Sequence, residues 1–386
     1  MTSINTPLSD SSGRIPLQSI PDLSATYVGL NKVGQSKFET QRSLALEPWH
    51  AALANRDNAP AKWLALGDSI TEGMGASTNL NRWTQRSLTG LRNRFATTGL
   101  TGGGTGFLPS HYDSTSMGQP YSASSGTPVL NTDFGIGRRT AQMTGTQTYT
   151  YTITCSSFDV WYVTPTTTGT IGVQIDGGAV ISVNTVGGTI LDGNVWNSGA
   201  LTPGTHTVVI SVVAGTTYFG GISVYNGDES KGIRLYEAGH YGWTTSNWLT
   251  NSNWWPRTIN TIQPHLVTIA LGTNDINAGV NPKTFGTNLN SLITSIRGQI
   301  TAPPSIVLVA YPARTDITPA YPWQSYVDQM HSIASADSLI SVLDLSVRMS
   351  SPSNTAIGTW NADKVHPVDK GHALIADTFT GFISPK

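Results

Sequence analysis

The sequence of 386 residues contains little cysteine, few charged side chains and no long apolar run. Cys155 is the only cysteine, so no disulfide can form within the chain, and its place in a strand-like run indicates a small buried side chain. No stretch of about 18 apolar residues occurs, which argues against a membrane-spanning helix. Residues 1–14 have neither the basic nor the apolar region of a signal peptide, so we expect synthesis in the cytoplasm without export by the usual secretory route.

Charge of one sign is not in excess either. The 22 Lys and Arg residues nearly balance 23 Asp and Glu residues, which gives a formal net charge of −1. This balance excludes proteins that hold nucleic acid or an anionic membrane mainly by charge, so we expect no nucleic-acid partner and no membrane insertion. With only 12% charged residues and 40 glycines, the surface must be rich in Ser, Thr, Asn and Gly. Such surfaces are typical of β-rich extracellular or virion proteins.

Changes in composition divide the chain into four segments. Residues 1–45 comprise an arm rich in Ser, Pro, Gly and Asn and the start of a helix expected over residues 36–58, and we interpret the arm as a tether or docking segment. Residues 46–112 and 231–386 alternate apolar runs with helical patterns. Residues 113–230 form an insertion between them.

The insertion has a composition of its own. No Lys or Arg occurs between Arg139 and Lys231, and Thr, Val, Gly and Tyr dominate. About six short strand-like runs, with turns such as Asp176-Gly177 between them, predict a small antiparallel β-sandwich of jelly-roll-like form. Such a domain serves either as a carbohydrate-binding module or as a lid and spacer.

The two segments around the insertion contain five short apolar runs separated by helical patterns. Runs of this kind predict parallel strands covered by helices on both faces, which is a three-layer α/β/α sandwich. Functional groups in such sheets gather at the carboxyl ends of the strands. The predicted strands are residues 62–66, 233–236, 266–271, 306–310 and 340–344.

Ser69 is the first candidate catalytic residue, in the motif GDSITEG of residues 67–73. It directly follows a predicted strand and begins a helix, so its hydroxyl is expected at the sheet edge and its N–H at the positive end of the helix. Taken alone, the tripeptide Gly-Asp-Ser is equally explained by a turn with a helix-capping serine.

Two more motifs follow predicted strands. Gly242, in the motif GHYGWTT, lets a backbone N–H approach a substrate oxygen closely, although a simple strand-to-helix turn also explains it. Asn274, in the motif GTND, has an amide that is able to donate a hydrogen bond to a developing oxyanion. Its alternative role is to cap the following helix.

The last motif, DKVHP, contains Asp363 and His366. A carboxylate three residues before a histidine is able to orient the imidazole, whose other nitrogen then accepts the serine proton. Asp328 and His331 have the same spacing but lie in a helical pattern, so we interpret them as a surface pair. We interpret His372 as a helix-surface histidine rather than a metal ligand, because no third ligand is apparent.

Together, the four motifs in this order resemble the conserved blocks of the SGNH (GDSL-type) hydrolase family. The resemblance covers residues 46–112 and 231–386 and implies a flavodoxin-like three-layer fold with a five-stranded parallel sheet. It also implies a serine esterase without metal or organic cofactor. The roles it assigns are Ser69 as nucleophile, His366 as general base, Asp363 as orienting acid, and the Ser69 N–H, Gly242 and Asn274 as the oxyanion hole.

The chain departs from the resembled pattern at two places. Glu237 stands where the second block often begins with Asn, and Lys364 follows Asp363 where the last block often has Gly. Neither departure removes a catalytic atom, so both bear on substrate preference. The Gly-x-Ser-x-Gly elbow of α/β-hydrolases is absent, and so are a His-Glu-x-x-His motif and a Lys-containing phosphate loop.

Aromatic residues near the motifs suggest the substrate. Arg82 and Trp83 follow the first motif, and Trp243 and Trp248 follow the second. Exposed tryptophans at such a site stack on sugar rings, whereas buried ones pack a helix onto the sheet. These four residues are therefore candidates for contacting the substrate, with core packing as the alternative for the tryptophans. The expected substrate is an acylated glycan or another ester, from which O-acetyl or other acyl groups are cleaved.

The arm suggests where the enzyme acts. Residues 13–28 resemble Ile-Pro and Pro-Asp-Leu segments of bacteriophage tail fibres and minor tail proteins, so we expect residues 1–35 to dock onto other tail proteins of a virion. A tail location is compatible with a homotrimer. Two alternatives stay open: a non-catalytic receptor- or glycan-binding tail protein on a hydrolase scaffold, and a cellular polysaccharide O-acetylesterase or lipase-like enzyme.

Overall fold

A computed structural model of the chain describes residues 44–100, 102–114, 116–166, 169–250 and 255–385. The expected docking arm, residues 1–35, and the first part of the helix expected over residues 36–58 lie outside the described residues. The part of that helix that is described is α2 (Glu47–Ala54). Residues from Ala45 onward form one compact unit.

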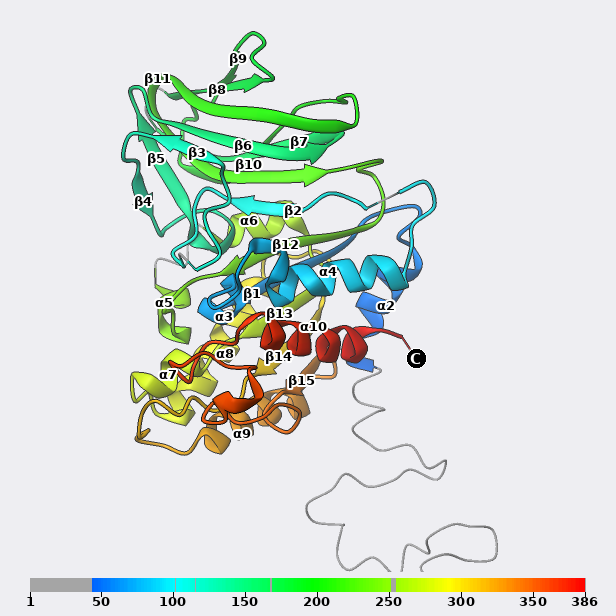
Figure 1. Ribbon diagram of the computed structural model, residues 1–386, viewed down its shortest axis with the longest axis vertical. Coiled ribbons are helices and arrows are strands. Elements are labelled where there is room, and N and C mark those ends of the chain that lie inside the picture. The colour runs from blue at the N-terminus through cyan, green and yellow to red at the C-terminus, as the bar shows by residue number, and fades with distance from the viewer. Residues whose placement is uncertain (1–43, 101, 115, 167–168, 251–254, 386) are drawn as a thin grey trace, which may run out of the picture. The chain divides into compact units, whose positions relative to one another are not determined.

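A five-stranded parallel sheet is formed by one strand before the insertion and four strands after it. Its order is β12-β1-β13-β14-β15, with every neighbouring pair parallel. The sheet lies between two layers of helices (Figure 1), which confirms the predicted α/β fold class. The strands are β1 (Ala61–Gly67), β12 (Ile233–Gly239), β13 (Leu266–Ala270), β14 (Ser305–Ala310) and β15 (Ile340–Asp344).

The two faces of the sheet are covered by different helices because successive side chains of a strand point to opposite faces. On one face, Trp63 of β1 packs against Trp83 and Phe379, which come from α4 and α10. On the other face, Leu64 and Leu66 belong to a core that includes side chains of α6, α8 and α9. The bounds of these helices are α4 (Trp83–Arg94), α6 (Pro256–Ile262), α8 (Pro282–Arg297), α9 (Trp323–Ala336) and α10 (Asp369–Ile383).

The inserted antiparallel strands surround a separate apolar core, as expected of a β-sandwich. The long strand β11 (Gly204–Tyr225) takes part in both halves: its first half pairs with β6 and β8, and its second half pairs with β2, β5 and β7. Cys155 lies buried in this core. The other strands are β2 (Gly106–Pro109), β3 (Ala123–Ser125), β4 (Val129–Asn131), β5 (Thr140–Thr144), β6 (Thr148–Cys155), β7 (Ser157–Thr164), β8 (Gly169–Ile175), β9 (Ile181–Asn184) and β10 (Leu191–Asn197).

The antiparallel strands meet the part built on the parallel sheet at β12 and α6. The backbone at Gly106, where β2 begins, lies against Leu235 of β12. Asp192 of β10 is fully enclosed and accepts hydrogen bonds from Gly135 N–H at 2.9 Å and Gly193 N–H at 2.7 Å. Thr261 of α6 donates to the carbonyl of Gly193 at 2.9 Å.

Among the described helices, none is long and apolar enough to cross a membrane.

Candidate active site

Ser69 lies at the carboxyl end of β1, where a tight turn joins the strand to the short helix α3 (Ser69–Glu72). Gly67 is required in this turn because a Cβ there would lie 2.1 Å from Oγ1 of Thr71. Asp68 caps α3, since its Oδ1 accepts a hydrogen bond from the N–H of Ile70 at 3.0 Å. The strand end and the cap together fix Ser69 at the sheet edge.

Hydrogen bonds join Ser69, His366 and Asp363, although Ser69 and His366 are 297 residues apart in the sequence. Oγ of Ser69 lies 2.9 Å from Nε2 of His366, and Nδ1 of His366 lies 2.8 Å from Oδ2 of Asp363. Oδ1 of Asp363 also accepts the N–H groups of Val365 at 2.9 Å and His366 at 3.0 Å. Partial burial acts to raise the pKa of Asp363, but these hydrogen bonds outweigh it and hold the pKa below its usual value.

Gly242 and Asn274 follow β12 and β13, which are the two neighbours of β1 in the sheet. The sheet order therefore places their loops on either side of β1, the strand that leads to Ser69. Gly242 has a left-handed backbone with φ of 75°. The side-chain amide of Asn274 donates a hydrogen bond to the carbonyl of Trp243 at 3.0 Å, which joins the two loops and fixes the amide plane.

Below this edge lies a buried network of two arginines and two glutamates, which the sequence analysis missed. Arg139 contacts Glu72 of α3 at 3.1 Å and Glu237 of β12 at 2.8 Å, and Arg82 contacts Glu237 at 3.1 Å. Burial raises the pKa of Glu72 to about 7, against the opposing effect of Arg139. The signal in the sequence was the pair Arg138-Arg139, which stands just before a long segment without Lys or Arg.

Three of the four expected substrate-binding residues need correction, because the side chains of Arg82, Trp83 and Trp248 are fully buried. Arg82 is held by Glu237 in the network described above. Trp83 packs edge-on against Phe379 at 5.2 Å, and Trp248 lies between two other tryptophans of the core. Closeness in sequence to the motifs did not reveal that these side chains point toward the sheet.

Two aromatic residues beside the catalytic loops remain accessible. Trp243 is partly exposed and stacks on His240 with ring centroids 3.7 Å apart. Tyr241, which the sequence analysis did not single out, is 46% exposed. Its ring lies nearly parallel to that of His366, at 16° and with centroids 6.4 Å apart. An exposed ring next to the histidine is suited to contact a substrate.

His372 lies on α10 as expected, but the prediction that its side chain lies on the helix surface was wrong. The ring is fully buried, and its nitrogens lie 3.3 Å from the N of Trp83 and 3.1 Å from the carbonyl oxygen of Met74. Burial lowers the pKa of His372 to about 4. The ring therefore joins α10 to α4 and to the loop after α3.

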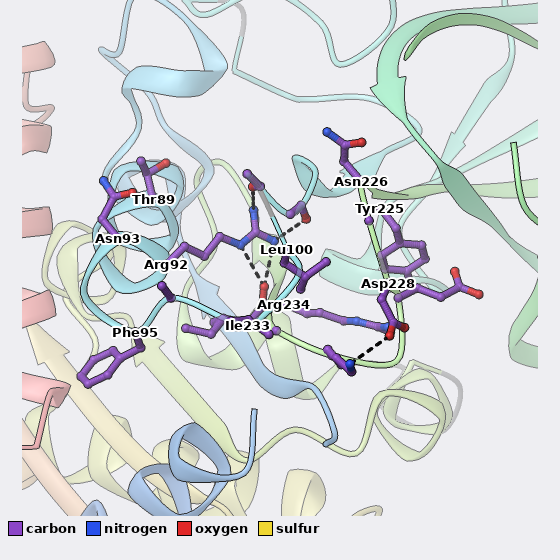
Figure 2. A pocket seen from close by; sticks show the side chains of 18 residues that line it. Thr89, Arg92, Asn93, Phe95, Leu100, Tyr225, Asn226, Asp228, Ile233 and Arg234 are labelled. Atoms are coloured by element: carbon purple, nitrogen blue, oxygen red, sulfur yellow. Dashed lines mark hydrogen bonds and ion pairs between the residues drawn. The ribbon is translucent and has the colours of Figure 1, made fainter. Parts of the chain in front are cut away.

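A cavity of about 370 Å³ lies at the amino end of β12, whereas Ser69 lies at the carboxyl end of the sheet (Figure 2). Arg92 lies along it and donates hydrogen bonds to the carbonyls of Ile233 at 2.8 Å and Gly103 at 2.7 Å. Its described lining residues include no serine, cysteine or histidine, so we do not place the chemistry there.

Comparisons with known proteins agree with this fold. Residues 221–374 match the model of the GDSL-like lipase/acylhydrolase family, a range that includes Gly242, Asn274, Asp363 and His366. A solved structure of a peptidoglycan O-acetylesterase is similar at a TM-score of 0.65, with 17% identity over 88% of this chain and 95% of that chain. No curated protein matches the sequence.

A family two carbohydrate esterase from Clostridium thermocellum in complex with cellohexaose is less similar. Its TM-score is 0.32 and its identity 14%, over 67% of this chain and 98% of that chain. Together with the fold described above, the match to an acylhydrolase family identifies the chain as a carboxylic ester hydrolase.

Proposed function

We propose that the chain is a serine esterase in which Ser69 is the nucleophile, His366 the general base and Asp363 the acid that orients it. The observation that carries the proposal is the series of two hydrogen bonds, 2.9 Å from Ser69 to His366 and 2.8 Å from His366 to Asp363. A histidine held in this way takes up the serine proton as the hydroxyl attacks an ester carbonyl.

The reaction proceeds in two steps. The Oγ of Ser69 attacks the carbonyl carbon while its proton passes to Nε2 of His366, and the tetrahedral intermediate then expels the alcohol, which receives that proton. Water, deprotonated by His366, next attacks the acyl-enzyme and releases the carboxylic acid and free Ser69. The N–H groups of Ser69 and Gly242 and the amide of Asn274 stabilise the oxyanion of both intermediates.

The test is hydrolysis of p-nitrophenyl acetate and longer-chain esters by wild type and Ser69→Ala. We expect the substitution to lower kcat by roughly 10⁴-fold or more, because the remaining groups cannot replace a nucleophile. Ser332→Ala is the matched control, since Ser332 is an exposed serine on α9. A Ser69→Ala variant as active as wild type would rule out the mechanism.

For the substrate we propose an acylated glycan, with O-acetyl groups as the first choice. Support comes from the exposed ring of Tyr241 beside His366 and from the similarity in fold to a peptidoglycan O-acetylesterase over 88% of this chain. The assay is release of acetate from O-acetylated peptidoglycan and O-acetylated polysaccharides, with Ser69→Ala as blank. Cleavage of small esters without release of acetate from any of these polymers would contradict the glycan substrate.

We further propose that residues 1–35 attach the enzyme to a bacteriophage tail, on the sequence resemblance of residues 13–28 to tail proteins. Deletion of residues 1–35 should abolish incorporation into particles and spare esterase activity. Particles that still contain the shortened protein would refute this role of the arm.

A further inference from the structure

One short segment of the antiparallel part, residues 135–140, reaches the loops at the catalytic edge. It contains the 3-10 turn η3 (Ile136–Arg138) and has left-handed φ values of 84° at Gly135, 70° at Gly137 and 56° at Arg138. A left-handed backbone is unfavourable for arginine, and strained residues of this kind cluster at functional sites. Arg138 contacts the loop after β12, whereas Arg139 contacts α3 and β12 itself.

Arg138 holds the loop that contains Gly242. Its guanidinium carbon lies 4.7 Å from the ring centroid of Trp243, and its Nη1 donates a hydrogen bond to the carbonyl of Asn247 at 2.7 Å. Trp243 directly follows Gly242 in the chain, and its carbonyl accepts the amide of Asn274. Arg138 of the inserted part thus contacts Trp243, the residue that links Gly242 and Asn274, two of the donors of the proposed oxyanion hole.

The backbone of the same segment holds the loop from a second direction. The carbonyl oxygen of Gly137 lies 2.8 Å from Nδ1 of His240, and the ring of His240 stacks on Trp243. A carbonyl oxygen only accepts, so Nδ1–H of His240 donates this hydrogen bond. Burial lowers the pKa of His240 to about 3, and its other ring nitrogen lies 3.3 Å from Oδ2 of Asp113. Trp243 is therefore fixed both by Arg138 and, through His240, by Gly137.

Arg139 connects the segment to the nucleophile. It forms ion pairs with Glu72, the last residue of α3, and with Glu237, two residues before the end of β12. Ser69 is the first residue of α3, so the guanidinium is joined to the serine through one turn of helix. Ion pairs buried this deeply add little net stability, and their better supported use is to fix one geometry.

We propose that residues 135–140 brace the oxyanion hole, and that Arg138 is a positioning residue that sets the places of the Gly242 N–H and the Asn274 amide by holding Trp243. The inference rests on the proposed esterase function. The antiparallel part is then a working component of the catalytic edge and not only a binding module.

The test compares Arg138→Met with Arg92→Met. Arg92 is a matched control because it is a partly buried arginine at the junction with the antiparallel part and also donates to backbone carbonyls (Figure 2), but at the amino end of β12. With active enzyme counted by titration of the acyl-enzyme burst, we expect Arg138→Met to lower kcat by roughly 10- to 100-fold, with KM within about threefold. Arg92→Met should change thermal stability but not kcat.

A second readout separates positioning from a general loss of structure. It is the ratio of activity on an oxoester to activity on the matching thionoester, in which sulfur replaces the carbonyl oxygen. Donors placed for an oxyanion act more weakly on sulfur, so the ratio should fall in Arg138→Met and stay unchanged in Arg92→Met. An unchanged ratio in Arg138→Met, or an equal fall of kcat in both variants, overturns the proposal.

If Arg138→Met does not fold, Arg138→Lys takes its place, because lysine keeps the charge near Trp243 but lacks the planar fork of donors. A smaller fall of kcat and of the ratio is expected, and no fall overturns the brace. The two proposals fail on different results. Full activity of Ser69→Ala would contradict the proposed esterase mechanism. Loss of activity in Ser69→Ala together with normal kcat in the Arg138 variants would contradict only the positioning role of Arg138.

Discussion

At the scale of single residues, the proposed acid is the most exposed member of the triad. The side chain of Asp363 is 41% exposed and that of His366 13% exposed. The orientation of Asp363 is nevertheless fixed, because its own loop donates two backbone N–H groups to the carboxylate. The triad therefore depends on the local conformation of residues 363–366, including the left-handed backbone of Lys364 with φ of 58°.

We expect Asp363→Asn to lower kcat by roughly 10³- to 10⁴-fold, because an amide holds the wrong histidine tautomer and does not stabilise the imidazolium. Asp328→Asn is the control, since Asp328 has the same spacing to His331 but lies on α9. Steady-state kinetics on p-nitrophenyl acetate measures both. A loss below tenfold for Asp363→Asn would mean that His366 is oriented without it.

Asn274→Ala should lower kcat by roughly 10²- to 10³-fold and leave KM nearly unchanged, because the amide acts on charge that develops in the transition state. Asn277→Ala tests the same change at an exposed position of the same short helix, α7 (Thr273–Asn277), and should have no effect on kcat. A rise in KM with constant kcat would instead assign Asn274 to substrate binding.

The proposed catalytic residues were predictable because Ser69, Gly242 and Asn274 each follow an apolar run that reads as a strand. The structure brings Ser69 together with His366 and Asp363 as the motifs suggested. The orientation of Arg82 and Trp248 was not predictable, since a side chain near a motif in sequence points to the core or to solvent according to packing that no local pattern encodes.

At the scale of elements, α3 is a single turn whose capping residue, Asp68, has an unusually high pKa. Asp68 is enclosed completely, and burial raises its pKa to about 7 against the opposing hydrogen bond from Ile70. Between about pH 4 and 7 the folded chain therefore keeps a proton that the unfolded chain has released. The contribution of Asp68 to the free energy of unfolding consequently falls as the pH rises through this window.

Asp68→Asn removes the ionisation and keeps the oxygen that caps α3. We expect the Tm of the variant to gain on that of wild type as the pH rises from about 4.5 to 7, measured by circular dichroism. Asp228→Asn, at an exposed aspartate whose pKa is lowered mainly by the Ser230 hydroxyl and N–H, should show no such gain. A constant or shrinking difference for Asp68→Asn would contradict a raised pKa at that residue.

Element boundaries were predictable where apolar runs stop at glycine, as at Gly67 after β1. The strand expected over residues 233–236 continues in the structure to Gly239. The sequence signalled an end at Glu237 because a carboxylate is rarely buried without a partner. Its partners, Arg82 and Arg139, come from distant segments, so no local pattern was able to reveal that the strand continues through a buried charge.

At the scale of the whole molecule, the antiparallel part begins and ends beside the same strand. Gly106 lies against Leu235, so a short linker in place of residues 106–225 is geometrically feasible. The deletion removes Arg139 and breaks its ion pairs with Glu72 and Glu237, at a cost of about 3–5 kcal/mol for a broken buried pair, while Glu237 keeps Arg82. We expect the shortened chain to be unfolded or insoluble and inactive.

Circular dichroism and esterase activity measure this outcome. Adding Glu72→Gln to the deletion removes the charge that has lost Arg139 and should recover part of the soluble yield, whereas Glu237 keeps its ion pair with Arg82. A soluble, active deletion product without this change would show that the hydrolase part stands alone. The charge network was not predictable at this scale, because its members lie on four segments that only the tertiary fold brings together.

The order of the parallel sheet also constrains how the chain is made. β1 lies between β12 and β13, and Ala61 pairs with Ile233. At about 5–20 residues per second, a ribosome needs on the order of ten seconds or more to add the residues between these partners. During that time the apolar strand β1, which leads to Ser69, has neither neighbour, and the nascent chain depends on early folding of the antiparallel part or on chaperones to keep it from aggregating.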